Sequence, residues 1–327
     1  MNEAPEKCGR AILQHVSLYN RGMIATSPPP HDRRAFLIGL MIAVTGAILF
    51  STKAIVAKLI YRYQIDAVTL LAFRMMFSLP FFAAIAFWKA RTEAPLSQIE
   101  LRRTITLGLI GYYLSSYLDF LGLQYISAGL ERLILFLTPS FVLLFSFFFL
   151  KKKMQAREWL SLGTAYLGTT MVFIHDVKVS GANVVLGSSF VLAGALSYAM
   201  YLMLSGEIVR RVGALRLVAY AMCASSAACI AQFFIMRPVS MLVQPMGFYG
   251  LSMINAIFCT VLPVFITMIA VARIGAATTS QAGMVGPVST LFLGAIILGE
   301  PVTSIQLAGT GLVLLGIYFL SRAPTLK

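Results

Sequence analysis

The 327-residue sequence is poor in the residues that catalytic and metal-binding proteins use. It has three histidines, all outside the long apolar segments, and four cysteines that are not spaced as metal ligands. The HExxH motif of zinc peptidases and the GxxxxGK[ST] motif that holds ATP phosphates are both missing, and no serine stands in a nucleophile context. We therefore expect no metal, no disulfide, no cofactor and no catalytic residue, and we do not expect an enzyme.

Charged residues are also scarce. They make up 12% of the sequence, hydrophobic residues make up 59%, and the mean hydropathy is +0.84, whereas about a quarter of a soluble domain is charged. The composition predicts an integral membrane protein. About 20 apolar residues cross a bilayer as a helix, and ten segments qualify: 36–60, 67–88, 104–123, 125–149, 157–174, 184–205, 214–236, 248–270, 275–298 and 302–320.

The two halves of the chain resemble each other. Aligning Pro139 with Pro287 sets an offset of 148 positions, and at this offset several glycines coincide: Gly39 with Gly187, Gly46 with Gly194, Gly163 with Gly311 and Gly168 with Gly316. Matched glycines and prolines indicate duplication, because they mark close helix approaches and kinks. Five spans per half would insert the second half upside down. We predict an all-α membrane protein with ten transmembrane helices as two inverted five-helix repeats.

This prediction divides the chain into five parts. Residues 1–35 form a polar, basic and mostly disordered cytoplasmic tail, in which Met23 is an alternative start. Residues 36–174 form the first repeat, 175–183 a connecting loop, 184–320 the second repeat and 321–327 the C-terminus. Pro139, Pro263 and Pro287, with Gly46 and Gly194, are the candidate hinge and packing positions.

The positive charges indicate the orientation. Most of the 26 lysines and arginines lie in the two termini and in the loops on the same side as the termini, whereas the opposite loops hold Arg62, Lys178 and Arg237. By the positive-inside rule both termini face the cytoplasm. Basic runs next to spans fit anionic lipid headgroups, so we expect a lipid bilayer and no nucleic acid as partner.

Ionisable residues inside the predicted spans are confined to the first half. They are Lys53 and Lys58 in span 1, Arg74 in span 2, Asp119 in span 3, and Glu131 with Arg132 in span 4. Such residues usually line a cavity or find a partner. Lys58 is also placed to extend to the outer interface, and Asp119 is near enough to its helix end to be a loop carboxylate. Because adjacent helical residues point about 100° apart, we do not expect Glu131 and Arg132 to face the same cavity centre.

Polar uncharged residues suggest which helix faces line a path. Tyr112, Ser116 and Asp119 follow helical spacing on span 3, and Thr260 and Thr267 occupy the equivalent positions on span 8. Such a stripe fits interhelix hydrogen bonds, but its recurrence favours a shared aqueous route. The remaining candidates for substrate contact are Tyr198, Tyr201 and Gln281.

With these residues in view, the sequence resembles the drug/metabolite transporter superfamily, EamA-type, over residues 36–320. The features that carry the resemblance are Gly46-Ala47 in span 1, the YISAG stretch at 125–129 leading to Pro139, Ile274-Gly275-Ala276-Ala277, Pro287 and Gly299-Glu300-Pro301. One departure is Lys152 in the first repeat where the second has Glu300. The resemblance implies a secondary transporter of the bacterial inner membrane, with a central cavity lined by helices 1, 3, 4, 6, 8 and 9.

The predicted function is export of a small metabolite by alternating access, driven by a gradient, with protons as the candidate coupling ion. In this hypothesis Lys53 or Arg74 faces a carboxylate of an amino acid or related zwitterion, the tyrosines face its apolar part, and Asp119 or Glu131 takes a cation or a proton. An organic-anion exchanger is the alternative, since the charges inside the spans have a positive surplus. A lipid flippase and a membrane-embedded enzyme are less favoured. We expect a monomer or a homodimer.

Overall fold

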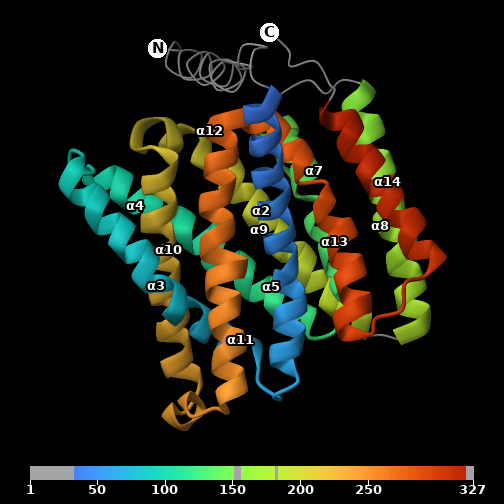
Figure 1. Ribbon diagram of the computed structural model, residues 1–327, viewed down its shortest axis with the longest axis horizontal. Coiled ribbons are helices and arrows are strands. Elements are labelled where there is room, and N and C mark those ends of the chain that lie inside the picture. Colours follow the sequence, from blue (N-terminus) through green and yellow to red (C-terminus); the bar gives the residue numbers. More distant parts are fainter. Residues whose placement is uncertain (1–32, 151–155, 181–182, 322–327) are drawn as a thin grey trace, which may run out of the picture.

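The computed structural model describes residues 33–150, 156–180 and 183–321, and within these ranges the chain is helical with no β-strand. The predicted tail of residues 1–35 lies almost wholly outside the described residues, as does most of the C-terminus. The helices stand side by side as one bundle, and both described chain ends, at the start of α2 and the end of α14, lie at the same end of it (Figure 1). We call this the near end and the opposite one the far end.

The helices of the first half cover the residues of the five segments predicted there. They are α2 (Arg33–Tyr61), α3 (Ala67–Thr92), α4 (Gln98–Gly108), the π-helical turn η1 (Leu109–Leu114), α5 (Ser115–Leu123), α6 (Ala128–Leu135), α7 (Thr138–Leu150) and α8 (Ala156–Ser180). The predicted span at 104–123 is thus α4, η1 and α5 in series, and the one at 125–149 is α6 and α7, separated by a turn just before Pro139.

The helices of the second half likewise cover the residues of the five segments predicted there. They are α9 (Asn183–Val212), α10 (Ala214–Met236), the 3₁₀ turn η2 (Val239–Leu242), α11 (Met246–Ala256), the π-helical turn η3 (Ile257–Val261), α12 (Leu262–Ala282), α13 (Val285–Leu293), the π-helical turn η4 (Gly294–Leu298) and α14 (Ser304–Ser321). Gly275 breaks α12, because its φ of 79° is outside the helical range.

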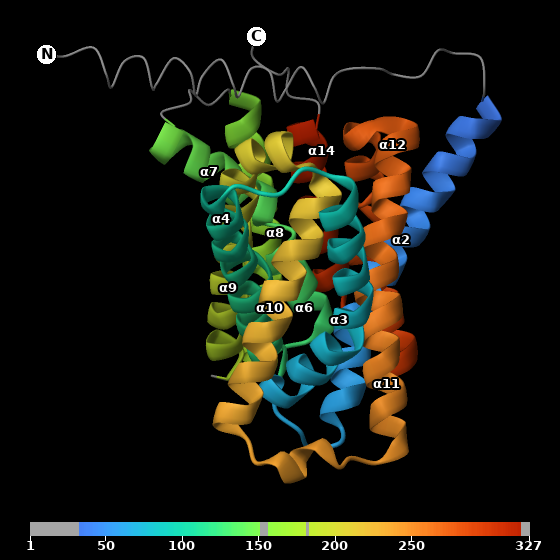
Figure 2. The ribbon, with the colours of Figure 1, turned by 90° about the vertical axis from the view of Figure 1, so that its left-hand side faces the viewer.

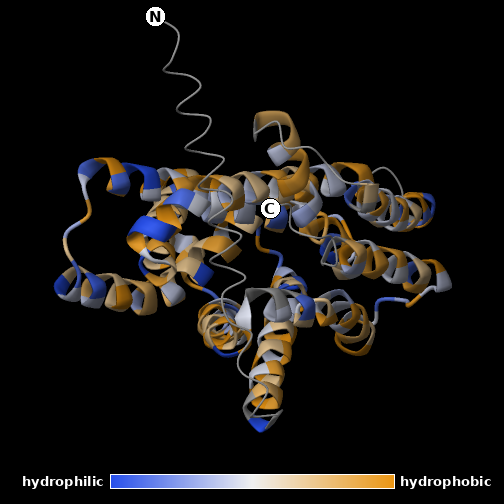
Figure 3. Ribbon diagram, turned by 90° about the horizontal axis from the view of Figure 1, so that it is seen from above, coloured by the Kyte–Doolittle hydropathy of each residue, from blue (hydrophilic) through white to orange (hydrophobic). Residues whose placement is uncertain are grey.

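Six helices of the described chain are long and apolar enough to cross a membrane. Viewed from the near end, the helices are mostly coloured hydrophobic, while hydrophilic residues gather at the connection from α3 to α4 (Figure 3). The prediction of a loop at 175–183 is wrong for residues 175–180, since α8 continues to Ser180 and α9 begins at Asn183. The physical reason is that polarity marks where a helix leaves the apolar layer, whereas the helix itself ends only where a Gly, a Pro or a cap stops it.

Equivalent helices of the two halves run in opposite directions and make equivalent contacts. In Figure 1, α3 rises from the far end whereas α10, its counterpart at the 148 offset, descends towards it. The pairs α2 with α12 and α5 with α9 exchange under the offset, and so do α2 with α13 and α9 with α7. The pairs α3 with α10 and α8 with α14 map onto themselves. An inverted duplication produces this pattern of contacts.

The predicted packing glycines lie at two of these equivalent contacts. A Cβ added to Gly46 in α2 would meet Ile266 at 2.9 Å and Thr267 at 3.4 Å, and one added to Gly194 in α9 would meet the backbone of Ser115 at 2.9 Å and Asp119 at 3.3 Å. Residues 118 and 119 correspond to 266 and 267 at the offset. The glycines therefore bring the first helix of each half against the third helix of the other half.

A π-helical turn recurs in the third helix of both halves. The turn η1 begins at Leu109 and η3 at Ile257, again 148 positions apart. An extra residue in a helical turn redirects the side chains that follow, and such turns are frequent at functional sites. They carry Tyr112 and Thr260, two of the predicted substrate contacts.

Candidate functional site

Five ionisable side chains predicted from the sequence are buried in the bundle. The exposed fraction is 6% for Lys53 and Arg74, 3% for Asp119, 0% for Glu131 and 5% for Arg132. They come from α2, α3, α5 and α6, so the second span contributes Arg74 although the family resemblance implied a lining without it. Burying a charge is costly unless it is paired, and the arrangement of these five decides how that cost is met.

Lys53 is the centre of the charged cluster. Its Nζ donates to Asp119 Oδ2 at 2.5 Å and lies 3.3 Å from Glu131 Oε1. One ammonium group therefore faces two carboxyl groups. Asp119 is not the solvated loop carboxylate that its position near a helix end allowed.

The two arginines flank this triad behind aromatic rings. Lys53 Nζ lies 5.7 Å from the centre of the Phe50 ring and 5.4 Å from that of Phe120. Arg132 contacts the Phe50 ring at 5.1 Å, and Arg74 contacts the Phe120 ring at 5.1 Å. Each of these two phenyl rings therefore has two cations over it, and a ring face attracts cations.

Neither arginine forms an ion pair with a carboxylate in the described part of the chain. Arg74 Nε donates to Thr260 Oγ1 at 2.8 Å, and Arg132 Nη2 donates to Ser51 Oγ at 3.1 Å. The acids are engaged by Lys53 instead. Glu131 and Arg132 were not expected to face the same cavity centre. Glu131 lies near Lys53 and Arg132 donates to Ser51, so the two side chains reach residues only two positions apart on α2.

Several polar atoms of the cluster have no hydrogen-bond partner among the described residues. On the donor side these are Arg74 Nη1 and Arg132 Nε. On the acceptor side they are Asp119 Oδ1 and both carboxyl oxygens of Glu131, of which Oε1 is near Lys53 but not aligned for a hydrogen bond. The carboxyl groups of Asp119 and Glu131 also lie within hydrogen-bonding reach of each other. Buried polar groups are normally satisfied, so unpaired groups of both signs in one cluster make it the candidate functional site.

The second half closes over the cluster with backbone and hydroxyl groups. Thr260 donates to the carbonyl of Asn255 at 2.9 Å, across the π-helical turn η3, while its Oγ1 accepts from Arg74. A Cβ on Gly286 in α13 would meet Arg132 Nη2 at 2.8 Å and Ser51 Oγ at 3.2 Å. The site therefore lies between the two halves, with its charges from one and its cover from the other.

Three predicted tyrosines form a separate aromatic group. The hydroxyls of Tyr112 and Tyr201 are 3.2 Å apart, and the rings of Tyr198 and Tyr201 stack with centres 5.6 Å apart. At the 148 offset, Tyr112 and Tyr201 correspond to Thr260 and Lys53. The positions equivalent to Tyr112 and Tyr201 thus hold a threonine that accepts from Arg74 and the lysine of the charged cluster.

The other predicted contacts lie elsewhere or are less enclosed. Ser116 is half-buried, and Thr267 and Gln281 are exposed. The inverted architecture explains why Thr267 is exposed whereas Asp119 is buried. The polar stripe on α5 runs from the middle of the bundle towards the far end, whereas its counterpart on α12 runs towards the near end. Of the predicted hinges, Pro139 and Pro287 follow equivalent breaks after α6 and α12, and Pro263 follows η3.

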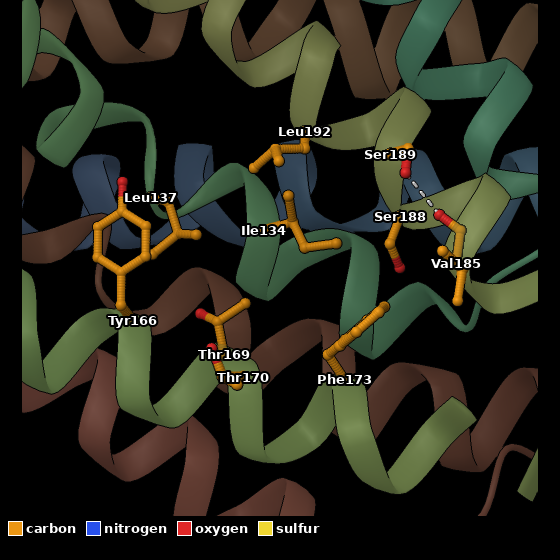
Figure 4. Close-up of a pocket in the computed structure, with 10 residues that line it drawn as sticks. All are labelled: Ile134, Leu137, Tyr166, Thr169, Thr170, Phe173, Val185, Ser188, Ser189 and Leu192. Atoms are coloured by element: carbon orange, nitrogen blue, oxygen red, sulfur yellow. Dashed lines mark hydrogen bonds between the residues drawn. The ribbon is translucent and has the colours of Figure 1, made fainter. Parts of the chain in front are cut away.

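A cavity of about 230 Å³ lies between α6, α8 and α9 (Figure 4). Its lining is mostly apolar, with hydroxyls such as that of Ser188, which is buried and has no partner among the described residues. Ile134 and Leu137 line it and belong to the segment that follows Glu131 and Arg132. The cavity does not include the charged cluster.

Sequence reasoning missed several contributors to the cluster. Phe50, Ser51 and Phe120 surround the charges, and Cys259 Sγ lies 3.1 Å from Thr52 Oγ1 beside Lys53. A phenylalanine in a chain with 23 of them carries no signal of its own. The spacing would have helped, since Phe50 lies one turn from Lys53 and Phe120 adjoins Asp119.

Comparison with known proteins identifies the family. A model of the EamA-like transporter family matches the chain twice, over residues 37–174 and 185–322. The two matches are offset by 148 positions, the same offset that aligns the prolines and the π-helical turns.

The chain belongs to the EamA-like transporter family.

Relatives of this EamA-like transporter carry the same general description. The chain is 30% identical to an uncharacterized transporter, YcbK, of Bacillus subtilis (strain 168) over 293 residues, which cover 86% of the chain and 90% of the relative. It is 27% identical over 223 residues, covering 68% of the chain and 78% of the relative, to an uncharacterized transporter of Archaeoglobus fulgidus. A solved crystal structure superposes with a TM-score of 0.59 at 17% identity, covering 86% of this chain and 96% of that one, which supports the fold. This EamA-like transporter is therefore a multi-pass membrane transporter of two-repeat architecture, consistent with the predicted superfamily.

Proposed function

We propose that this EamA-like transporter is a secondary active exporter of small zwitterionic metabolites, such as amino acids, and that it works by alternating access. In this proposal ten helices cross the bacterial inner membrane with both termini in the cytoplasm. The first repeat comprises residues 36–174 and the second 184–320. The charged cluster between the repeats is the solute site.

The observation that carries the proposal is the set of unpaired groups in the cluster. The carboxylate of a zwitterion would accept hydrogen bonds from Arg74 Nη1 and Arg132 Nε, whereas its ammonium group would donate to Asp119 Oδ1 and Glu131. Charge-assisted hydrogen bonds of this kind are short and strong. A solute carrying both signs satisfies donors and acceptors together, which a singly charged solute does not.

Organic-anion exchange is the second candidate, and the charge balance favours it. Lys53, Arg74 and Arg132 outnumber Asp119 and Glu131 by one, and both guanidinium groups lack a carboxylate partner within the described chain. An anion would neutralise this surplus. The two candidates differ in what the acids do, since an anion needs only the arginines.

Transport into proteoliposomes separates these possibilities. Purified protein is reconstituted, and counterflow of labelled amino acids and of labelled mono- and dicarboxylates is measured with and without an imposed pH gradient. We expect amino-acid counterflow that is lost in Arg132→Gln and weakened in Asp119→Asn and Glu131→Gln. Dicarboxylate flux that survives in both acid variants would instead establish the anion exchanger. If neither panel is transported, or if Arg132→Gln leaves flux unchanged, the proposed site is wrong.

Proton coupling is tested in the same vesicles. If Asp119 or Glu131 takes the coupling proton, its amide variant should retain counterflow at zero gradient but lose the acceleration by a pH gradient. Arg216→Gln is a matched control, because Arg216 is also 6% exposed but contacts Glu93 and the carbonyl of Ala94, outside the cluster. It should leave solute preference and coupling unchanged.

A further inference from the structure

The backbone of the segment after α13 fixes the position of the Glu300 carboxylate. The π-helical turn η4 ends at Leu298, and its C-cap Gly299 has a left-handed φ of 73°, which suits glycine. The backbone N–H of Glu300 donates to the carbonyl of Gly294 at 3.2 Å, and Pro301 prevents the helix from continuing. Gly294 also leaves room for the acid, since a Cβ there would lie 3.1 Å from Glu300 Oε2.

The carboxylate of Glu300 accepts from the first residue of α6. The backbone N–H of Ala128 lies 3.1 Å from Glu300 Oε1 and 3.2 Å from Oε2. The first N–H groups of a helix have no partner inside it and carry partial positive charge, so a carboxylate there is favourable. Ser127 caps the same helix through the N–H of Leu130. Glu131 and Arg132 follow within about one turn, so the bond to Glu300 orients the segment that carries two cluster residues.

This bond joins the two repeats at the far end of the bundle. Ala128 lies in the first family match and Glu300 in the second. The position equivalent to Glu300 in the first repeat is Lys152, and an ammonium group has no acceptor for a backbone N–H. At the near end, the first turns of α2 lean away from the bundle (Figure 2).

We propose that Glu300 is a latch that holds the repeats together at the far end, and that breaking its bond to Ala128 accompanies the opening of the charged cluster towards that side. The inference rests on the proposed alternating access. Glu300 acts through α6 and does not contact the solute, so it is a positioning residue. Because the bond lies at the far end, it favours the state that is closed there.

The native Cys259 reports this opening without any substrate. Its side chain is 0% exposed and lies beside Thr52 in the cluster. After Cys8, Cys223 and Cys229 are replaced by serine, a membrane-impermeant maleimide is applied separately to either side of oriented vesicles. We expect slow labelling from the far side in the parent protein. Glu300→Ala should raise that rate by about tenfold, which corresponds to a shift of about 1.4 kcal/mol.

Three further variants make the test specific. Glu300→Gln keeps an acceptor oxygen and should label close to the parent rate, whereas Glu300→Asp keeps the charge but shortens its reach and should resemble Glu300→Ala. Thr303→Ala is the matched control, because Thr303 caps α14 within the second repeat by bonding to Gln306. It should not change labelling. Each variant must first elute as a single species after heating at a temperature that the parent withstands.

The outcomes decide the latch independently of the solute. Faster labelling from the far side in Glu300→Ala and Glu300→Asp alone supports it. An unchanged rate in Glu300→Ala, an equal rise from both sides, or the same rise in Thr303→Ala would overturn it. Since labelling needs no solute, failure of the amino-acid panel leaves this result standing, and failure of the latch leaves the counterflow result standing.

Discussion

Replacing Lys53 by methionine removes the one ammonium group that two buried carboxylates share. Methionine is similar in length and apolar, so packing against Phe50 and Phe120 is largely kept, and the main change is electrostatic. Asp119 and Glu131, 3% and 0% exposed, would then lie in the bundle without their cation. Arg74 and Arg132 are held by Thr260 and Ser51, which limits their ability to replace it.

Breaking a buried ion pair by removing one partner costs about 3–5 kcal/mol. At about 2 °C per kcal/mol for a chain of this size, we expect Lys53→Met to melt roughly 6–10 °C below the wild type. Melting is followed in detergent by circular dichroism and by recovery of the monodisperse peak after heating. The measurement is repeated at two detergent concentrations, so that a change in micelle does not pass for a change in the protein.

A triple variant tests the cause. Adding Asp119→Asn and Glu131→Gln to Lys53→Met removes the uncompensated charges, and most of the lost stability should return because the three sites are coupled. Transport should stay lost in the triple variant, since the groups that bind solute are gone. Should Lys53→Met melt within about 1 °C of the wild type, or the triple variant melt as low as Lys53→Met, the electrostatic reading of the cluster is wrong.

Three other predictions concern packing, the loops and the arginine contacts. Gly194→Ala should lose about 1–3 kcal/mol, because its Cβ meets backbone at 2.9 Å, whereas Gly206→Ala on the same helix, with nothing within 4 Å, should be neutral or stabilising; equal melting shifts for the two would contradict the close approach. Burial alone would raise the pKa of Asp66, but hydrogen bonds from Arg237 and Thr69 outweigh it and lower the pKa below its usual value. The resulting stability is about 1 kcal/mol or less for so exposed a pair. It is present above the ordinary pKa of an aspartate and is lost as the pH falls through the lowered pKa of Asp66, so the difference in melting temperature between the wild type and Asp66→Asn should shrink between about pH 5 and pH 3. A difference that stays constant over this range would exclude the stabilising ion pair. Thr260→Val should cost about 1–3 kcal/mol by removing the acceptor of Arg74 Nε, while Thr267→Val, at an exposed position, should cost little; similar losses in both would argue against the bond.

Much of the fold could be predicted because its signals are periodic and recur. The offset set by Pro139 and Pro287 also relates the π-helical turns, the contacts of Gly46 and Gly194, and the two family matches. The ends of helices were less predictable. The segment 175–180 was read as loop because it is polar, yet α8 passes through it.

The charged residues that gather inside the bundle could be predicted from the sequence, but their pairing could not. Charge inside an apolar span is rare enough to single out Lys53, Arg74, Asp119, Glu131 and Arg132, and these do gather. Which cation takes which acid depends on side-chain reach, which has no sequence signal, and on the rings of Phe50 and Phe120, which are marked only by their spacing from Lys53 and Asp119. Glu300 stood out only as a mismatch with Lys152, and its bond to Ala128 required the positions of both repeats.

The central claim is that the charged cluster between the repeats binds the transported solute. Melting of the wild type and of Arg132→Gln, Asp119→Asn and Arg216→Gln in the presence of a panel of amino acids and organic anions tests this claim most directly, since a ligand that binds the folded state raises its melting temperature. We predict that at least one zwitterion stabilises the wild type and Arg216→Gln but neither cluster variant. A ligand that stabilises all four proteins equally would show that solute binds somewhere else.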